Sequence, residues 1–318
     1  MEKNQTLYLV IPCYNEEAVL PETSKRLLGK MNTMIENNLI NNKSKIVLVD
    51  DGSKDTTWEI IEQLNNENNI FSGIKLSRNK GHQYALMAGL MTVKDSADMV
   101  ISLDADLQDD INAIDKFVEE YYNGSDIVYG VRSSRKKDTF FKKNTALAFY
   151  KLMSIMGVDI VYNHADYRLM SKRVLNELAN FKEVNLFLRG IIPLIGFKSA
   201  IVEYERNERF AGESKYPLKK MISFAIDGIT SFSVKPIRMV LNLGIVMLLV
   251  SFIMLIYAVV VKIMGHAEAG WAFIICSIWL VAGVQMLSLG IIGEYVGKIY
   301  SEVKARPKFI IEKFINRD

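Results

Sequence analysis

Two long apolar stretches towards the C-terminal end constrain the fold of this 318-residue chain more than any other feature. Between residues 240 and 261 only Asn242 and Ser251 are clearly polar, and residues 271–292 contain three polar side chains. A helix needs about 20 apolar residues to cross the hydrocarbon core of a bilayer. We therefore predict two transmembrane helices, at about residues 240–261 and 271–292, joined by a tight hairpin.

Basic residues flank both stretches. Lys235 and Arg238 precede the first stretch, and six lysines and arginines follow the second. Because Lys and Arg are enriched in cytoplasmic loops, the pattern predicts that the large N-terminal part and both termini lie in the cytoplasm. The net charge of +3 is too small to indicate a nucleic-acid partner.

The first 131 residues alternate between short β-rich runs and segments with helical spacing of apolar residues. This alternation is typical of an α/β fold with a mostly parallel, Rossmann-like sheet and helices on both faces. Thr56-x-x-Glu59 reads as a capping box at a helix start. The segment with His164, Asp166 and Arg168 has no such run and is predicted to be a loop. The predicted strands are residues 7–11, 46–49, 74–76, 99–103, 127–131 and 200–204. The predicted helices are residues 20–35, 56–64, 84–90 and 113–121, with a further helix near residues 146–156.

Four aspartates fall at the carboxyl ends of predicted strands. Asp50 and Asp51 follow the second strand, and Asp104 and Asp106 follow the apolar run that ends at Leu103. Ligands of open α/β sheets bind beyond these ends, so the four carboxylates should converge on one crevice. The Asp-x-Asp pair places both carboxylates on one side, which suits Mg²⁺ or Mn²⁺ carrying phosphate groups. A solvated turn after the strand is the alternative explanation.

Five short motifs stand out along the chain. Each is weak alone, but their order and the two apolar stretches that follow them are more specific. They are Pro12-Cys13-Tyr14-Asn15-Glu16-Glu17, Val49-Asp50-Asp51-Gly52-Ser53, Arg78-Asn79-Lys80-Gly81, Asp104-Ala105-Asp106-Leu107-Gln108 and Asp166-Tyr167-Arg168-Leu169-Met170.

With these motifs the chain resembles glycosyltransferase family 2. The two closing spans make it similar to polyprenyl-phosphate glycosyltransferases, the bacterial relatives of dolichyl-phosphate mannose synthase. The resemblance implies a GT-A domain over residues 1–215 and a membrane domain with a basic cytoplasmic tail over residues 235–318. Between them, residues 216–234 have one apolar helical face and are predicted to be an interfacial amphipathic helix, with packing against the soluble domain as the alternative. The resemblance also implies a multi-pass protein of the bacterial cytoplasmic membrane.

The resemblance implies a metal-assisted donor site. Asp106 would hold Mg²⁺ or Mn²⁺, with Asp104 on the ribose or the metal and Gln108 assisting. Such a cation would stabilise the diphosphate leaving group of a nucleotide sugar as a Lewis acid. The chain departs from the family in two places: Asp109-Asp110-Ile111 replaces a usual Asp and paired prolines, and His82-Gln83 stands where relatives often carry Lys or Glu.

The same resemblance implies which residues line the nucleotide pocket. Asp51 is the candidate for the base ring, because a carboxylate can accept the imide proton of uracil. For Asp50 a loop-ordering hydrogen bond is the alternative. Lys80 is the candidate for the diphosphate, against an exposed loop lysine. The full predicted set is Pro12, Tyr14, Asn15, Glu16, Asp50, Asp51, Lys80 and Asp104.

On the acceptor side, a lipid monophosphate is already largely ionised near neutral pH, since its second pKa is about 6. Positioning should therefore matter more than deprotonation. The resemblance puts Asp166 near the reacting centre, as a base or an orienting group, with a helix-capping or Arg168-pairing carboxylate as the alternative. The residues predicted for the acceptor phosphate are Arg132, Arg135, Arg206, Arg209, Ser214 and Lys215.

These features together predict an inverting, metal-dependent transferase that moves one hexose from a nucleotide donor to undecaprenyl phosphate, for modification of a cell-envelope glycan. UDP-glucose and UDP-N-acetylglucosamine are the leading donors, with GDP-mannose as the alternative. A processive polysaccharide synthase and a non-catalytic membrane scaffold are the rival classes. Four glycines in the second span, Gly283, Gly290, Gly293 and Gly297, would permit close helix contacts in a homo-oligomer.

Overall fold

The structure of the protein, a computed structural model, describes residues 4–133, 156, 164–184, 186–205, 229–230, 233–264 and 270–317. These residues form two compact units. The sheet unit contains the described residues of 4–133, 164–205 and 306–317, and the hairpin unit contains those of 156 and 229–305. Except for residue 156, the predicted helix near residues 146–156 lies outside the described residues, as does most of the predicted amphipathic helix at 216–234.

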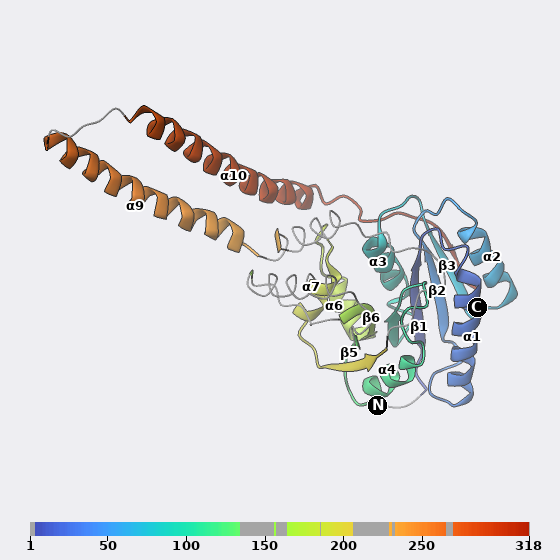
Figure 1. Ribbon diagram of the computed structural model, residues 1–318. Helices are drawn as coiled ribbons and strands as arrows, with labels where there is room; N and C mark the ends of the chain where they lie inside the picture. Colours follow the sequence, from blue (N-terminus) through green and yellow to red (C-terminus); the bar gives the residue numbers. More distant parts are fainter. Residues whose placement is uncertain are drawn as a thin grey trace. The chain divides into compact units, whose positions relative to one another are not determined.

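The sheet unit is built on one eight-stranded sheet with the order β7-β5-β6-β4-β1-β2-β3-β8 (Figure 1). Strands β6 and β8 are antiparallel to their neighbours, while all the other pairings are parallel. The strands are β1 (Leu7–Cys13), β2 (Lys45–Asp50), β3 (Phe71–Leu76), β4 (Met99–Ser102), β5 (Ile127–Arg132), β6 (His164–Ser171), β7 (Ser199–Tyr204) and β8 (Ile311–Ile315). The helices are α1 (Leu20–Glu36), α2 (Thr57–Glu67), α3 (His82–Val93), α4 (Ala113–Tyr122), α6 (Lys172–Leu178) and α7 (Leu188–Leu194).

Helices cover both faces of the sheet (Figure 1). On one face, Leu7, Leu9 and Ile11 of β1 are buried in a cluster with residues of α1, α2 and α4. On the other face α3 packs closely on β1 and β2, since a Cβ at Gly89 would lie 2.4 Å from Cγ1 of Val10. The central strands are therefore buried on both sides, as expected of parallel strands in an α/β layer fold.

The sequence prediction of a mostly parallel α/β fold is confirmed, and two strands change its detail. The segment at residues 164–171 is strand β6, so the prediction of a loop there is wrong. Its charged residues break any apolar alternation, yet Arg168 is fully buried in it. The prediction of a capping box at Thr56 is also wrong. The Thr56 side chain makes no cap hydrogen bond, and its hydroxyl donates instead to Glu17 Oε2 at 2.7 Å.

The second unpredicted strand, β8, lies in the segment predicted to be a basic cytoplasmic tail. Residues Ile311–Ile315 follow the last helix and pair antiparallel with β3 at the edge of the sheet. The part of the chain before the hairpin unit and the part after it therefore belong to one sheet.

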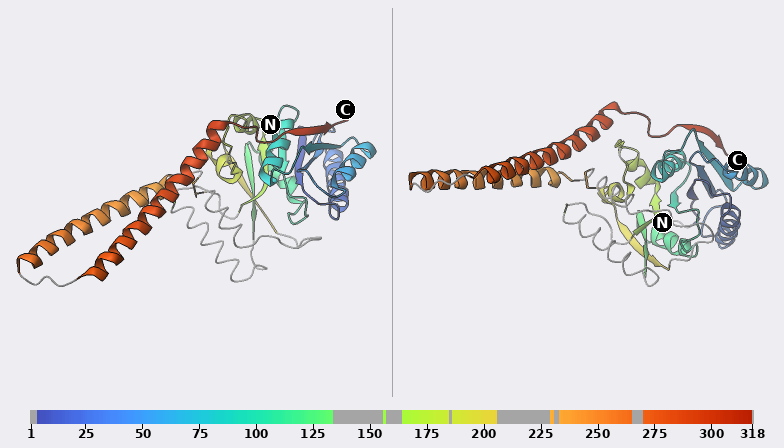
Figure 2. Two further views of the ribbon diagram at one scale, coloured as in Figure 1. Left: turned by 90° about the horizontal axis from the view of Figure 1, so that it is seen from above. Right: turned by 45° about the horizontal axis from the view of Figure 1, so that its top comes forward.

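The hairpin unit consists mainly of α9 (Lys235–Ile263) and α10 (Trp271–Lys304), which run alongside each other (Figure 2). The predicted spans at 240–261 and 271–292 lie within these helices. Each helix contains a stretch long and apolar enough to cross a membrane, by length and composition. Tyr295 of α10 donates a hydrogen bond from its hydroxyl to the Ser233 carbonyl at 2.5 Å, which ties α10 to the chain just before α9.

Candidate active site

The carboxyl edge of the sheet collects the chemically interesting side chains. Asp50 ends β2, and Asp104 follows the end of β4 by two residues. Strand β6 runs the other way, so its first residues, not its last, reach this edge. The Ser102 hydroxyl at the end of β4 donates to the Asp166 carbonyl at 2.6 Å, which places Asp166 of β6 beside the Asp104 loop.

His82, the first residue of α3, lies between two of these carboxylates. Its Nε2 is 3.6 Å from Asp104 Oδ1 and 3.8 Å from Asp166 Oδ2. Burial raises the pKa of the Asp51 carboxyl, and the charge of His82 is one of the influences that oppose this rise. The structure thus brings three of the predicted aspartates, Asp51, Asp104 and Asp166, near a histidine that stands out in the sequence only as a departure from the family. The available signal was its position directly after Gly81, where β3 gives way to a helix.

Asp166 is held by two arginines. It accepts a hydrogen bond from Arg168, and Arg189 of α7 donates to both its oxygens, from Nε at 3.2 Å and from Nη2 at 3.0 Å. Burial alone would raise the pKa of Asp166, but the Arg189 and Arg168 guanidinium groups outweigh it and hold this pKa well below its usual range. The two arginines thus favour the ionised form of Asp166, which makes its carboxylate a weak base. Arg189 was missed because no motif or spacing around it marks it in the sequence.

The loop after β4 aims the Asp-x-Asp pair. Leu107 has a left-handed backbone with φ of 56°. The Asp106 Oδ1 oxygen accepts the Gln108 N–H at 3.1 Å, which fixes the turn. Burial raises the pKa of Asp104, as do the negative charges of Asp166 and Asp106, whereas His82 and Arg189 lower it. A cation bound beside Asp104 would therefore favour the ionised form of this carboxyl.

Asp104 and Asp106 have the chemistry of ligands for a divalent metal ion. Among the described residues, no three His, Cys, Asp or Glu side chains form a preformed cation cage. Mg²⁺ commonly binds through one or two carboxylates together with substrate phosphates, and keeps water as further ligands. Asp104 and Asp106 are hard oxygen donors, and Asp106 is close enough to Asp104 to raise the pKa of that carboxyl, so the pair fits a cation that arrives with a nucleotide.

Asp51 organises the loop after β3. Its two oxygens accept the backbone N–H groups of Lys80 at 2.7 Å and Gly81 at 2.8 Å. The neighbouring Gly52 has φ of 67°, and a Cβ there would lie 2.6 Å from the Asn79 nitrogen. Because only glycine fits such a close approach, the loops after β2 and β3 are packed backbone to backbone.

Asp50 is fully buried and accepts the Ser53 N–H at 3.1 Å, which is the loop-ordering bond given above as the alternative. Its Oδ2 has no hydrogen-bond partner among the described residues. Burial raises the pKa of Asp50 and also that of Asp51. Both carboxylates thus lie under the loops rather than on the surface.

The first predicted motif forms the loop after β1. Asn15 has a left-handed φ of 53°; its N–H donates to Ser53 Oγ at 3.0 Å, and its side-chain oxygen accepts the Lys54 N–H at 2.8 Å. Pro12 is buried at the end of β1, the Glu16 N–H donates to Thr57 Oγ1, and the Tyr14 side chain is exposed. The loops after β1 and β2 are therefore joined, and these loops with the strand ends before them carry all the residues predicted for the nucleotide except Lys80 and Asp104.

Of the residues predicted for the acceptor phosphate, the structure describes Arg132; Arg135, Arg206, Arg209, Ser214 and Lys215 lie outside the described residues. Arg132 ends β5, and its Nη2 lies 3.9 Å from Asp109 Oδ1. The Tyr204 hydroxyl donates to the same Asp109 oxygen at 2.5 Å. Burial and the nearby Asp104 charge raise the pKa of Asp109 to about 6.

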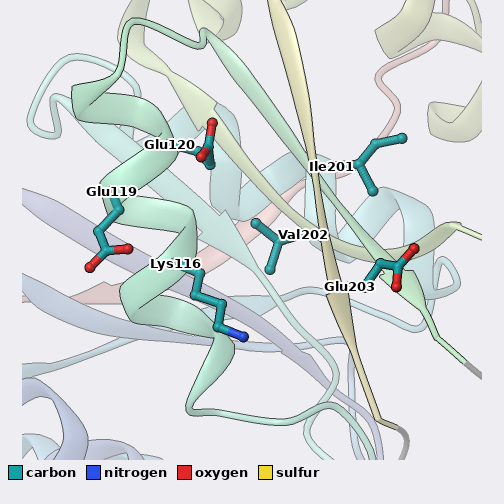
Figure 3. A pocket seen from close by; sticks show the side chains of 6 residues that line it. All are labelled: Lys116, Glu119, Glu120, Ile201, Val202 and Glu203. Carbon is teal, nitrogen blue, oxygen red and sulfur yellow. The ribbon is translucent and has the colours of Figure 1, made fainter.

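An open hollow on another part of the sheet unit contains none of these residues (Figure 3). Its walls come from α4 and β7, and Figure 3 shows the Val202 side chain projecting towards the helix, while Ile201 points to the other side of its strand. The lining side chains are Lys116, Glu119, Glu120, Ile201, Val202 and Glu203. The chemistry of the carboxyl edge, rather than the presence of a hollow, therefore identifies the candidate site.

Comparison with known proteins finds relatives that match nearly the whole chain. The Glycosyl transferase family 2 profile matches residues 8–179. The glycosyltransferase YkoT of Bacillus subtilis is 56% identical over 98% of this chain and 93% of its own length. A prophage bactoprenol glucosyl transferase homolog of Escherichia coli and the SfII prophage-derived bactoprenol glucosyl transferase of Shigella flexneri are each 38% identical over 96% of this chain, and over 98% and 97% of their own lengths.

Solved structures are more distant. A mannosyltransferase from Pyrobaculum calidifontis, in complex with GDP-Man and Mn²⁺, has a TM-score of 0.44 and 13% identity, covering 96% of this chain and 88% of its own. Glucosyl-3-phosphoglycerate synthase from Mycobacterium tuberculosis has a TM-score of 0.44 and 15% identity, covering 71% and 76%. The profile match and the close relatives over nearly the full length decide the assignment: the chain belongs to glycosyltransferase family 2.

Proposed function

We propose that this glycosyltransferase moves a single hexose, glucose or N-acetylglucosamine, from a UDP-sugar to undecaprenyl phosphate with inversion. The product would be a lipid-phosphate-linked sugar for modification of a cell-envelope glycan. The observation that carries the proposal is at the carboxyl edge of the sheet, where Asp104 and Asp166 both lie close to His82 and Asp106 is near enough to Asp104 to raise the pKa of that carboxyl. The relatives named bactoprenol glucosyl transferase support the lipid acceptor, because they match nearly the whole chain at 38% identity.

Asp106 and Asp104 would hold Mg²⁺ or Mn²⁺, with Gln108 assisting. The cation would supply Lewis-acid stabilisation of the diphosphate as it leaves. The remaining work falls to the protein's own groups. Asp51 fixes the Lys80–Gly81 backbone, from which Lys80 would reach the donor diphosphate. Pro12, Tyr14, Asn15, Glu16 and Asp50 would form the rest of the nucleotide pocket, with Asp51 also near the base.

Asp166 would orient the reactants instead of removing a proton. Its charge is fixed by Arg168 and Arg189, and the acceptor phosphate needs no strong base because its second pKa is about 6. The phosphate oxygen would attack the anomeric carbon directly, the bond to the diphosphate would break, and a UDP-α-sugar would give a β-linked product. Arg132 would attract the acceptor phosphate, together with Arg135, Arg206, Arg209, Ser214 and Lys215.

The apolar helices α9 and α10 would anchor the enzyme in the bacterial cytoplasmic membrane, with the sheet unit and both termini in the cytoplasm. This arrangement suits a reaction in which the donor is water-soluble and the acceptor is a lipid. The glycines of α10 would allow homo-oligomer contacts.

The test uses membranes from cells expressing the full chain, supplied with undecaprenyl phosphate, Mn²⁺ or Mg²⁺, and one radiolabelled donor at a time: UDP-glucose, UDP-N-acetylglucosamine or GDP-mannose. We expect an organic-extractable labelled product with one of the two UDP-sugars. Membranes without the chain are the control. A product formed only from GDP-mannose would show that the donor is GDP-mannose and not a UDP-sugar. A long polymer would indicate a processive synthase, and no transfer from any donor would indicate a non-catalytic role.

A further inference from the structure

The strand β8 closes the sheet next to the donor site. It pairs with β3 from Gly73 opposite Ile315 to Leu76 opposite Ile311. The pairing continues one step beyond the strand, because the Ser77 N–H donates to the Ile310 carbonyl at 3.0 Å. The last hydrogen bond between the two segments is therefore made where β3 gives way to the loop that carries Lys80.

Side chains also fix β8 in place. Ile315 packs against the main hydrophobic core, and a Cβ at Gly73 would lie 2.9 Å from its Cγ1. Lys313 makes an ion pair with Glu62 of α2 at 2.6 Å. The Ser72 hydroxyl donates to the Asn316 side chain at 2.8 Å. These contacts include apolar packing, an ion pair and a hydrogen bond. Together they specify one register for the pairing of β8 with β3, so β8 is not a loosely attached tail.

The loop beyond β3 links this pairing to the site. Residues 77–81 lie between the Ile310 hydrogen bond on one side and the Asp51 carboxylate on the other. The Arg78 and Asn79 backbone presses on Gly52, and His82 follows directly, facing Asp104 and Asp166. Both ends of the loop are thus fixed, one of them by a strand that lies more than 220 residues later in the sequence.

We propose that β8 is a positioning element of the donor site: by holding the end of β3, it keeps residues 77–82 in the shape that Asp51 and the Asp104–Asp166 cluster require. The inference rests on the proposed function only for its consequence on nucleotide binding. Its structural part, the ordering of the loop by β8, stands without it.

The test compares the full chain with a variant that ends at Lys308, both purified in detergent. Hydrogen–deuterium exchange reports the order of residues 77–82 directly, because the Lys80 and Gly81 amides are bonded to Asp51. Binding of UDP with Mg²⁺, measured by titration calorimetry, reports the donor site. Without β8 we expect exchange in residues 77–82 to rise at least tenfold and UDP affinity to fall at least fivefold, while exchange in β1 and β4 stays unchanged. A synthetic peptide of residues 306–318 should restore both.

A matched pair of point variants covers the case in which the shortened chain does not fold. Ile315→Ala removes the buried contact of β8 with Gly73, whereas Phe314→Ala changes a half-exposed side chain on the neighbouring position. Only Ile315→Ala should speed exchange in residues 77–82. Wild-type exchange of this loop in both the shortened chain and Ile315→Ala would overturn the inference. Faster exchange in a protein whose unaltered form binds no UDP would uphold the role of β8 and contradict the proposed donor.

Discussion

Asp166 shows how a neighbour decides the role of a side chain. By sequence it was a base or an orienting group, with a helix-capping or Arg168-pairing carboxylate as the alternative, because the residues themselves do not indicate how many cations surround it. The structure supplies Arg168 from the same strand and Arg189 from α7, and both contact its carboxylate. A carboxylate held between two guanidinium groups keeps its charge and its direction, which are the properties needed to align a phosphate nucleophile.

Replacing Asp166 with Asn should destabilise the protein by about 3 to 5 kcal/mol, because fully buried Arg168 loses its counter-charge. The pKa of Asp166 is lowered by folding, so its stabilisation is fully present above the unfolded value of about 3.9 and is lost only as the pH falls below it. The difference in Tm between wild type and Asp166→Asn, followed by thermal unfolding, should therefore be constant from pH 5 to pH 8. Asp95→Asn, at an exposed side chain, is the control and should change Tm little. A difference that grows between pH 5 and pH 8 would mean that Asp166 titrates as a base would.

Asp106→Asn should reduce hexose transfer about 100-fold or more, since it removes a charged ligand of the cation that neutralises the leaving diphosphate. Initial rates at saturating donor over a series of Mn²⁺ concentrations measure the effect. Excess Mn²⁺ should not restore the rate, and Tm should stay near the wild-type value because the Asp106 side chain is partly exposed. An Asp106→Asn enzyme with wild-type transfer would remove this residue from the donor site.

At the scale of elements, the sequence could predict the strands that are runs of apolar residues, but not the strand rich in polar residues. Strands β1, β2, β4 and β5 are continuous buried runs, and each was predicted close to its observed bounds. Strand β6 was missed because its polar residues are buried through ion pairs and hydrogen bonds that only the folded chain provides. The missing strand also hid the reason why Asp166 reaches the same edge as Asp104, namely that an antiparallel strand brings its beginning there.

The packing of helix α3 on the sheet can be tested with two glycines. Gly89→Ala should destabilise the sheet unit by about 1 to 3 kcal/mol, because the new Cβ would lie 2.4 Å from Val10 and 2.8 Å from Val49. Gly29→Ala, in the middle of α1, meets no atom within 4 Å and should stabilise by about 0.5 to 1 kcal/mol. Denaturant unfolding of the two variants should thus give shifts of opposite sign. A Gly89→Ala variant with the wild-type free energy of unfolding would show that α3 can move away from β1 without loss of stability.

At the scale of the whole molecule, the apolar hairpin is an insertion within a sheet-forming chain. Strand β7 precedes α9 and strand β8 follows α10, and both strands are parts of the same sheet. The sequence predicted the two helices from their length and composition alone. It could not predict the return of the chain to the sheet, because a five-residue edge strand rich in charge carries little pattern.

The proposed membrane topology predicts the reactivity of introduced cysteines. Gly270→Cys, at the start of α10, should react with a membrane-impermeant maleimide added to intact spheroplasts, because the hairpin turn would lie outside. Asp95→Cys, on the exposed surface of the sheet unit, should react only after the membrane is opened. Labelling of both positions before opening, or of neither position after it, would contradict the proposed topology.

The central claim is that Asp104 and Asp106 hold the cation that carries the donor diphosphate. Diffraction at the manganese absorption edge, from crystals grown with UDP and Mn²⁺, tests it most directly. We predict one anomalous peak at coordination distance from an Asp106 oxygen, with the UDP diphosphate on the same ion. A peak among Glu119, Glu120 and Glu203, or bound UDP with no ion near Asp104 and Asp106, would contradict the claim.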